Sequence, residues 1–541
     1  MTSTQRPPGQ QHIPDILDCL AQLSNDAVPT PPTLARAMLD LLPEDVWTNP
    51  NLKWLDPCCK SGVLLREIAS RLLYGLQEWE PEFHGRREHI FRNMLYGASI
   101  TEMTGTIARR SVYCSRDAAG EHSVVRFDDL QGQIPFIPTE HDFGKDSKAK
   151  SCAICGVPAS LERGSTRDNH AYSFIHGTYP TQEMSDMKFD VIVGNPPYQV
   201  GSEGHGATAS TIYHRFVEAA MDLNPRHIVM ITPSRWFAGG KGLDGYRAKM
   251  IADRRIRAIV DNPKLFDCFP AVEIKGGVSY FRWDRDYDGD CEFSIRIDGI
   301  IRSTMMRDLR DGDGVLIRDN RAMSIIQKAR LAEARVEDRC TVTKPFGLTM
   351  RSNYAGSVPE PFEGAIPLIY SSKIGYSRPD QIQRNHQWID RWKVLIPRTG
   401  DGHGREKAYV LGEPIALAPG SACTQTYFIA GMFDTPKETE NYAHYLATKF
   451  VRFLVLQRKV TQDVTPERFK FAPMLDMTRR WTDEDLYDHF RLNEEERAYI
   501  EATINPRDVI LSLDSPIPVS HLPGGSKYRP GPVVEESDDE E

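Results

Sequence analysis

Long apolar segments are missing from this 541-residue sequence. No window of about 18 consecutive apolar residues occurs, so we expect no membrane-spanning helix and no membrane partner. The N-terminal segment MTSTQRPPGQQ is polar and lacks the apolar centre of a signal peptide. The ten cysteines are unevenly spread and include one CxxC pair. This usage argues against a disulfide framework and predicts a reducing, cytoplasmic location with at most one metal site.

A surplus of basic charge is also missing. The formal net charge is −9, but the last seven residues, EESDDEE, carry six negative charges, and without them the chain carries −3. A nearly neutral body can still present local basic faces. The net charge therefore neither excludes nor supports a nucleic-acid partner. With 40% hydrophobic residues the chain can bury a substantial core.

Internal repeats are absent, and segments typical of strands and helices alternate instead. Residues 51–76 predict a strand, a turn of small residues and a helix, and 89–113 predict a helix, a second strand and another helix. SVVRF (123–127) predicts a third strand, and FDVIVG (189–194) a fourth. Such alternation indicates a doubly wound, mostly parallel α/β sheet, which binds ligands beyond the carboxyl ends of its strands.

Beyond about residue 290 this alternation fades into a mixture of short strands, loops and helices. The pattern predicts five regions. They are an N-terminal extension (1–27), an α/β domain (28–290) with a Cys/His-containing insertion (114–185), an α+β domain (291–480), a helical pair (481–510) and a disordered acidic tail (511–541).

The first strand ends in WLDPCCKSG, which places Asp56 and small residues before a helix. Small residues let a ligand approach the backbone N–H groups at a helix N-terminus. The stretch therefore predicts a cofactor site, although a plain strand–helix turn has the same composition.

A later strand ends in Asn195-Pro196-Pro197-Tyr198. Two prolines fix the backbone, so that the Asn195 side-chain oxygen and the Pro196 carbonyl can both accept from one exocyclic NH2 group. An adenine amino group is a poor nucleophile, and two rigid acceptors increase its reactivity most strongly in the transition state. The Tyr198 ring offers a face for stacking a base. The alternative is a loop that only follows the strand and has no catalytic role.

Together these motifs resemble S-adenosylmethionine-dependent DNA adenine-N6 methyltransferases, and more narrowly the Eco57I-type restriction-modification methylases with gamma motif order. The resemblance rests on TPPTLARAML (30–39), LDPCCKSGVLL (55–65) and DVIVGNPPY (190–198), and it covers about residues 28–285. It implies a Rossmann-like class I methyltransferase domain, a flipped target adenine in double-stranded DNA and a C-terminal target-recognition domain. The partners that it implies are DNA and a cognate restriction endonuclease or helicase.

The resemblance also assigns the S-adenosylmethionine site. The residues it implies are Thr30, Pro31, Asp56, Pro57, Ser61, Gly62, Glu102 and Asp128. Lys60 stands where the family pattern has its first glycine, and it either is solvated or faces the cofactor carboxylate. Ser99 stands where an acid binds the ribose, so Glu102 takes that role or is an exposed acid at a helix start. Asp129 competes with Asp128 for the cofactor adenine.

The insertion carries a CxxC turn at Cys152 and Cys155. With Cys114 and His141 it predicts a tetrahedral Zn2+ site, which would staple a polar loop that has no core of its own. His122 is the second choice for the histidine ligand, and free thiols in a loop are the alternative.

Basic and aromatic residues after the catalytic motif predict contacts with DNA. They are Arg235, Trp236, Lys373, Arg398 and Lys459. Packing of the tryptophan and simple solvation of the charges are the alternatives. The Gly/Ser-rich stretch 199–210 is either a loop that closes over a flipped base or a linker.

Other activities are compatible with parts of the sequence. Glu273 and Lys275 form a fragment of a metal-nuclease pattern, which would make the chain a bifunctional restriction-modification enzyme that uses Mg2+. Methyltransferases acting on glutamine or RNA share the logic of NPPY, but the glutamine enzymes are much shorter. A non-catalytic DNA-binding specificity module would lose nothing when Asn195 is replaced.

Overall fold

The computed structural model of the chain describes residues 28–518, apart from internal gaps. The gaps are 145–150, 157–171, 185–186, 201–209, 239–241, 265, 270–273, 275, 343, 350–357, 372, 401–406 and 460–462. The chain divides into two compact units, Met1–Asn320 and Arg321–Glu541. The division differs from the predicted boundary at residue 290, because the sheet of the first unit continues beyond it.

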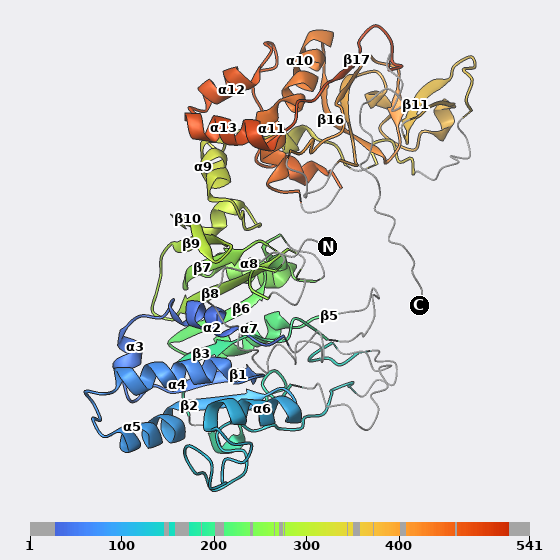
Figure 1. Cartoon of the computed structure of the whole chain (residues 1–541). Coiled ribbons are helices and arrows are strands. Elements are labelled where there is room, and N and C mark those ends of the chain that lie inside the picture. Colours follow the sequence, from blue (N-terminus) through green and yellow to red (C-terminus); the bar gives the residue numbers. More distant parts are fainter. Residues whose placement is uncertain are drawn as a thin grey trace, which may run out of the picture. The chain divides into compact units, whose positions relative to one another are not determined.

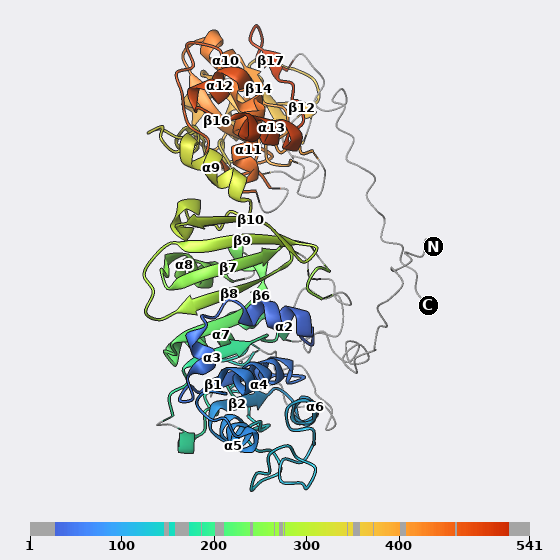
Figure 2. The same ribbon diagram turned by 60° about the vertical axis from the view of Figure 1, so that its left-hand side comes forward.

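The first unit is built on one eight-stranded sheet, with strand order β10-β9-β7-β8-β6-β3-β1-β2 (Figure 2). Its strands are β1 (Trp54–Cys59), β2 (Leu95–Ser99), β3 (Val191–Gly194), β6 (His227–Pro233), β7 (Ile256–Asn262), β8 (Val278–Asp284), β9 (Cys291–Ile297) and β10 (Ile300–Arg307). The pairs β2–β1, β1–β3 and β3–β6 are parallel. This half of the sheet brings the carboxyl ends of four strands to one edge.

β8 is the exception to the parallel arrangement. It is inserted between β6 and β7 and runs antiparallel to both. The antiparallel hairpin β9–β10 then extends the sheet past β7, which pairs with β9 in parallel. The sheet is therefore mixed. The alternation of strands and helices predicted a mostly parallel sheet, which holds only for the half that contains β2, β1, β3 and β6.

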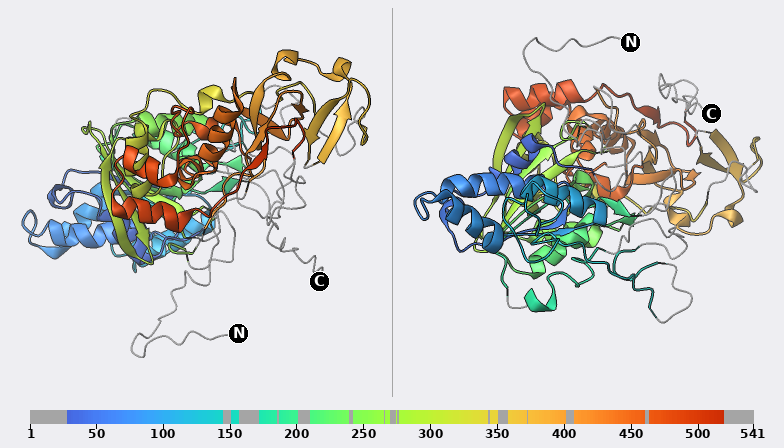
Figure 3. Two further views of the ribbon diagram at one scale, coloured as in Figure 1. Left: turned by 90° about the horizontal axis from the view of Figure 1, so that it is seen from above. Right: turned by 60° about the horizontal axis from the view of Figure 1, so that its bottom comes forward.

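Helices cover the half of the sheet formed by β1, β2, β3 and β6, whose strands are buried along their whole lengths. Every residue of β1, β2, β3 and β6 is buried, and such strands need a layer on each face. α2 (Pro32–Leu39), α4 (Val63–Gly75) and α6 (Glu102–Tyr113) pack in sequence, with α2 against α4 and α4 against α6 (Figure 1, Figure 3). α7 (Tyr213–Asp222) packs on β6, and the other α-helices in the described part of this unit are α3 (Asp45–Thr48), α5 (Phe83–His89) and α8 (Asp244–Ala252).

The third strand predicted at 123–127 is wrong, since these residues form no strand. A later, irregular segment lies beside β2 instead. The N–H groups of Gly97 and Ser99 donate to the carbonyls of Gln133 (2.9 Å) and Pro135 (3.0 Å). Prolines at 135 and 138 cannot donate to a ladder, so the segment covers the edge without becoming a regular strand.

The second unit contains both strands and helices. β12 (Lys373–Ser377), β11 (Ile366–Tyr370) and β15 (Ala422–Cys423) form one sheet, and β16 (Tyr427–Phe433), β13 (Trp392–Pro397), β14 (Ile415–Leu417) and β17 (Ile510–Ser512) form another. Its helices are α9 (Asn320–Ala329), α10 (Pro436–Ala447), α11 (Lys449–Leu456), α12 (Asp483–His489) and α13 (Glu494–Thr503).

The predicted C-terminal boundaries are only partly those of the structure. The helical pair predicted at 481–510 is present as α12 and α13. β17 pairs with β14 in parallel, so its last two residues belong to the sheet and not to the predicted tail from residue 511. Residues 519–541 lie outside the described residues. In the part of the chain that is described, no helix combines the length and the apolar character needed to span a membrane.

A buried carboxylate at the end of β7 stabilises the part of the first unit around that strand. Asp261, at the end of β7, is fully buried, and it accepts a bidentate pair of hydrogen bonds from Arg318 (2.8 Å each) and one from the Ser234 hydroxyl (2.8 Å). Arg318 also donates to the Gly276 carbonyl at 2.7 Å. One buried charge thus joins three segments that are distant in sequence.

Replacing Arg318 by Met should destabilise this unit, because it leaves the buried Asp261 charge with a single hydroxyl donor. We expect a loss of about 3 kcal/mol in the free energy of unfolding, measured by urea titration. Lys264→Met breaks an exposed ion pair with Asp298 (2.7 Å) and should cost less than about 1 kcal/mol. Equal losses for the two variants would contradict the assignment.

Candidate functional site

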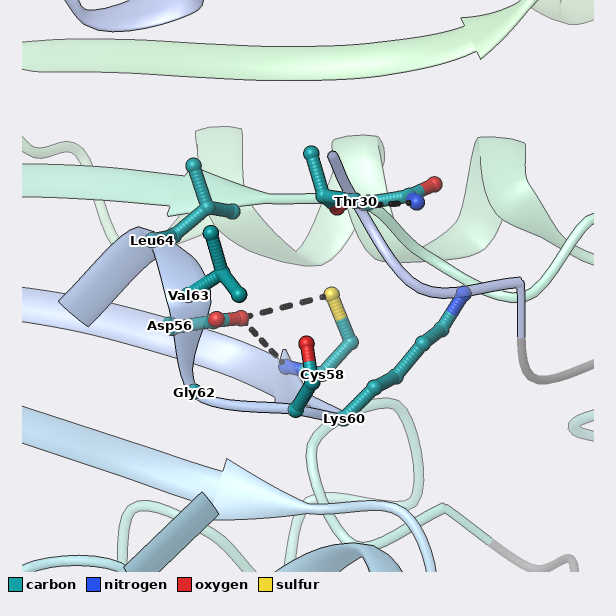
Figure 4. A pocket seen from close by; sticks show the side chains of 9 residues that line it. Thr30, Asp56, Cys58, Lys60, Gly62, Val63 and Leu64 are labelled. Atoms are coloured by element: carbon teal, nitrogen blue, oxygen red, sulfur yellow. Dashed lines mark hydrogen bonds between the residues drawn. The ribbon is translucent and has the colours of Figure 1, made fainter. Parts of the chain in front are cut away.

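A pocket of about 220 Å³ lies at the carboxyl ends of β1 and β3 (Figure 4). Its lining residues are Thr30, Asp56, Cys58, Lys60, Ser61, Gly62, Val63, Leu64 and Asn195. They come from three stretches of sequence: the segment before α2, the turn from β1 to α4, and the end of β3. Part of that volume is open to solvent, and the enclosed space is far smaller than the roughly 300–1,000 Å³ of pockets that hold whole small ligands, so the pocket has room for only one part of a larger ligand.

The turn from β1 to α4 requires glycine at position 62. Gly62 has φ +73°, and a Cβ there would lie 2.9 Å from the Ala108 carbonyl oxygen of α6. In the described part of the chain, no side chain caps the N-terminus of α4. The free N–H groups of its first turn are therefore available to a ligand in the pocket.

Asp56 is the only acid among the described residues that line the pocket, and it is almost fully buried. It accepts hydrogen bonds from the Cys58 N–H (3.2 Å) and the Cys58 thiol (3.6 Å). Burial raises the pKa of Asp56 to about 6, despite these bonds and the Lys60 charge. A cationic group placed beside it would reverse that shift and hold the carboxyl ionised.

The Asn195 side chain is fixed in one orientation. Its Nδ2 donates to the Val28 carbonyl (3.2 Å) and to the Thr30 hydroxyl (3.1 Å). Because a carbonyl can only accept, the amide cannot be flipped. Its Oδ1 is buried and has no hydrogen-bond partner among the described residues. The side chain therefore presents a desolvated acceptor, which is costly unless a ligand donates to it.

Lys60 is buried beside this amide and not solvated. Its ammonium donates to the Val28 carbonyl at 3.3 Å and lies 5.9 Å from the centre of the Tyr198 ring. Figure 4 shows its side chain reaching from the turn toward the segment before Thr30. Tyr198 is itself nearly buried, with its ring against Tyr213 and Phe269.

The other predicted cofactor residues lie around the pocket or outside it. Thr30 and Ser61 line it, Pro31 is the N-cap of α2, and Pro57 lies in β1. Glu102 is the exposed first residue of α6, which follows the end of β2. Asp128 is exposed on an irregular segment.

The two competitors of these acids are engaged elsewhere. Ser99 is buried, and its hydroxyl donates to the Pro135 carbonyl at 2.9 Å. Asp129 accepts from the N–H groups of Gln131 (2.8 Å) and Gly132 (2.9 Å), as a turn-capping side chain does.

Two of the five residues predicted to contact DNA are buried, and the prediction is corrected for both. Trp236 is fully buried against Phe237 (4.7 Å between rings), which leaves no face for a base. Lys459 is 2% exposed, and its ammonium donates to the Val410 carbonyl at 2.9 Å.

The other three predicted contacts remain at least partly accessible. Lys373 is exposed at the start of β12, and Arg235 is half-buried. Arg398 is half-buried 3.7 Å from Asp463. Glu273 and Lys275, the nuclease fragment, lie outside the described residues, as does most of the loop predicted at 199–210.

Three of the four predicted metal ligands lie together. His141, Cys152 and Cys155 form a group with His176, which the sequence prediction did not include. Cys114 is exposed at the C-terminus of α6 and is not part of the group. His122 is exposed and lies beside Glu121. The sequence does contain a pattern that could have indicated His176, because it is the second histidine after the CxxC turn.

Two comparisons identify relatives of this chain. Residues 93–269 match the family described as Eco57I restriction-modification methylase. An uncharacterized adenine-specific methylase of Mycoplasma pneumoniae is 38% identical over 301 residues, which are 51% of this chain and 71% of that protein.

Solved structures of restriction-modification proteins are similar at lower levels. The nuclease-deletion mutant of the Type ISP enzyme LlaGI, in complex with a DNA substrate mimic, has a TM-score of 0.44 and 10% identity, over 91% of this chain and 48% of that one. The DrdV–DNA complex has a TM-score of 0.40 and 12% identity, over 91% and 60%. The EcoKI M protein has a TM-score of 0.32 and 13% identity, over 51% and 50%. This chain thus spans about half of these longer chains.

Gly194→Ala tests how closely β1 and β3 approach at the pocket. The new Cβ would come within 2.9 Å of the Cys58 sulfur, so the end of β3 must shift. We expect a loss of about 1–3 kcal/mol in the free energy of unfolding, measured by thermal and urea unfolding. Cys58→Ala in the same chain should recover part of that loss, and an unchanged loss in the double variant would contradict the contact.

Proposed function

The chain belongs to the Eco57I restriction-modification methylases, and on this premise we propose that it transfers a methyl group from S-adenosylmethionine to the N6 amino group of adenine in double-stranded DNA. The observation that carries the proposal is the fixed Asn195 amide, whose Oδ1 is buried without a partner among the described residues. An exocyclic amino group is the kind of donor that such an acceptor requires.

The pocket beside Asn195 fits one end of the cofactor. S-adenosylmethionine carries two cationic groups, an ammonium and a sulfonium, and it supplies the electrophilic methyl group. Asp56 would face the cationic groups, with Thr30, Ser61 and Gly62 around them, and the first turn of α4 would donate N–H groups to the carboxylate at the same end. In this proposal Glu102 binds the ribose and Asp128 the cofactor adenine, with Pro31 and Pro57 shaping the backbone.

The target base would enter from the side of Tyr198. Asn195 Oδ1 and the Pro196 carbonyl accept from the N6 amino group, and Pro197 keeps that carbonyl in place. The base would stack on the Tyr198 ring, which has the Lys60 ammonium 5.9 Å from its centre. The proton lost from N6 then passes to solvent.

Arg235 of the first unit and Lys373 and Arg398 of the second would contact duplex DNA. The second unit would then contain the target-recognition domain. A cognate restriction endonuclease or helicase is the protein partner that a restriction-modification role calls for. A DNA substrate implies work in the cytoplasm.

Asn195→Ala removes the acceptor that carries the proposal. We expect methylation to fall by at least ~100-fold, as when one preorganised polar group is lost from an active site, while S-adenosylmethionine still binds. The measurements are base-modification sequencing of DNA from cells expressing each variant and calorimetric titration with the cofactor. Asn93→Ala, on the surface in a π-helical turn, is the matched control and should keep full activity.

Either of two results would overturn the proposal. One is DNA from wild-type cells without N6-methyladenine at any recurring sequence. The other is full methylation by Asn195→Ala.

The pH dependence of cofactor binding tests the role of Asp56. Its pKa in the folded chain, about 6, exceeds its ordinary value of 3.8. Below pH 6 the carboxyl is neutral, so affinity for a cationic ligand should fall by up to about tenfold per pH unit as pH decreases. The free energy of unfolding without ligand should change oppositely and decrease as pH rises from 4 to 6, since the folded carboxyl holds its proton more tightly.

Calorimetric titration with S-adenosylmethionine between pH 5 and 7 measures the binding effect. Asp56→Asn should bind more weakly at pH 7 and show little dependence on pH. A wild-type affinity that is flat over this interval would exclude Asp56 as the partner of the cationic end.

A further inference from the structure

A four-residue cluster outside the pocket has the composition of a metal site. His141, Cys152, Cys155 and His176 each offer one ligand atom, and these atoms all lie within 4.8 Å of one another. The Cys155 sulfur is 3.2 Å from His141 Nδ1, and the two histidine rings are 5.8 Å apart and nearly perpendicular. Bonds of 2.0–2.3 Å to one tetrahedral ion place neighbouring ligand atoms roughly 3.3–3.8 Å apart. The cluster needs little adjustment to reach that spacing.

The spacing favours a single ion over other uses of two cysteines and two histidines. In a dinuclear iron–sulfur centre with this donor set, the cysteines bind one iron and the histidines the other. Here one cysteine sulfur and one histidine nitrogen nearly touch, as they do around one ion. Neither cysteine is in a disulfide, and both are buried. Two thiolates and two imidazoles in tetrahedral geometry select Zn2+.

The surrounding segment has a reason to need a metal. Between α6 and β3 the described residues form one short 3-10 turn, Gln182–Met184, and no other helix or named strand. Such a long connection is uncommon without a staple. Cys152 and His176 lie in hydrogen-bonded turns. The Gly156 N–H donates to the Cys152 carbonyl (2.9 Å), and the His176 N–H donates to the Tyr172 carbonyl (3.1 Å).

The two halves of the cluster are also held together by neighbouring side chains. The hydroxyls of Thr139 and Thr178, each two residues from a histidine of the cluster, are 2.8 Å apart. Tyr172 and Phe174, just before His176, pack their rings on Phe216 of α7. The site therefore rests on the helix that follows the catalytic motif.

The end of the CxxC turn lies near the segment that leads away from Tyr198. A Cβ on Gly156 would lie 3.2 Å from the Ser210 hydroxyl in β5 (Ser210–Thr211). β5 pairs with β4 (Gln199–Val200), which begins directly after Tyr198. The Ile212 N–H donates to the Tyr198 carbonyl at 3.3 Å. A rigid CxxC turn would thus restrain the hairpin that supports the stacking ring.

We propose that His141, Cys152, Cys155 and His176 bind one structural Zn2+ ion, and that this ion secures the β4–β5 hairpin behind Tyr198. His176 takes the ligand place that the sequence prediction gave to Cys114. The metal assignment is independent of the methyltransferase proposal; only the role of the hairpin in holding the target base rests on it.

The metal content of the full chain tests the assignment. Protein purified without a metal-affinity step should contain one zinc per chain by mass spectrometry, and Co2+ exchanged into it should show the absorption of a tetrahedral site with sulfur ligands. Cys152→Ser and His176→Ala should retain less than about one fifth of the zinc. Cys114→Ser is the matched control and should keep all of it, and His176→Cys should restore it by supplying another zinc ligand.

Wild-type measurements decide the question even if the ligand variants fail to fold. Wild-type chain with no zinc and no Co2+ uptake overturns the proposal, as does a Cys152–Cys155 disulfide found by peptide mass spectrometry. Zinc lost from Cys114→Ser but kept by His176→Ala overturns the ligand set.

Hydrogen exchange tests the role given to the ion. When zinc is removed by a chelator, peptides covering β4, β5 and Ile212 should exchange at least tenfold faster, while β1 should be unchanged. S-adenosylmethionine should still bind within about threefold, because the pocket contains none of the zinc ligands. Unchanged exchange in the hairpin would overturn this role without bearing on methylation.

Discussion

The hydrogen bond from the Asn195 amide to the Val28 carbonyl is the contact on which the site depends. That carbonyl also accepts from Lys60, so one backbone oxygen positions both the Asn195 amide and the ammonium beside Tyr198. A carbonyl cannot donate, and this property fixes which end of the amide faces the pocket. Asn195 follows directly after β3 and Val28 lies in the segment before α2, so the bond joins that segment to the edge where the parallel strands end.

Sequence reasoning succeeded where structure is decided locally. The run from β1 through the small-residue turn into α4 was predictable, because apolar strand, Gly62 and amphipathic helix are adjacent in the chain. The strand before Asn195 was predictable for the same reason. The strand expected at 123–127 failed because a strand needs a partner edge, and the edge of β2 is taken by residues 133–136. The reversed direction of β8 depends likewise on long-range pairing.

The motifs identified residues that do lie together, but not the contacts that hold them in place. Asn195, Asp56 and Thr30 were identified from motifs and do meet at one pocket. The burial of single side chains could not be predicted from the sequence. Lys60 is buried beside Tyr198, and Trp236 is buried inside the unit and cannot contact DNA. The composition of the insertion indicated a metal site, yet which residue joins His141, Cys152 and Cys155 depends on how distant turns fold together, and that residue is His176.

The pairing of β1 with β3 joins Trp54 to Val191, and the pocket takes its walls from both sides of that pairing. Contacts between residues so far apart in sequence form slowly during folding. During synthesis the chain must therefore extend beyond Asn195 before the pocket can form. A shorter nascent chain can already contain β1 and α4, but ligand binding, which stabilises only assembled states, contributes nothing until then. The first half of this unit must therefore reach its strand order unaided by the cofactor.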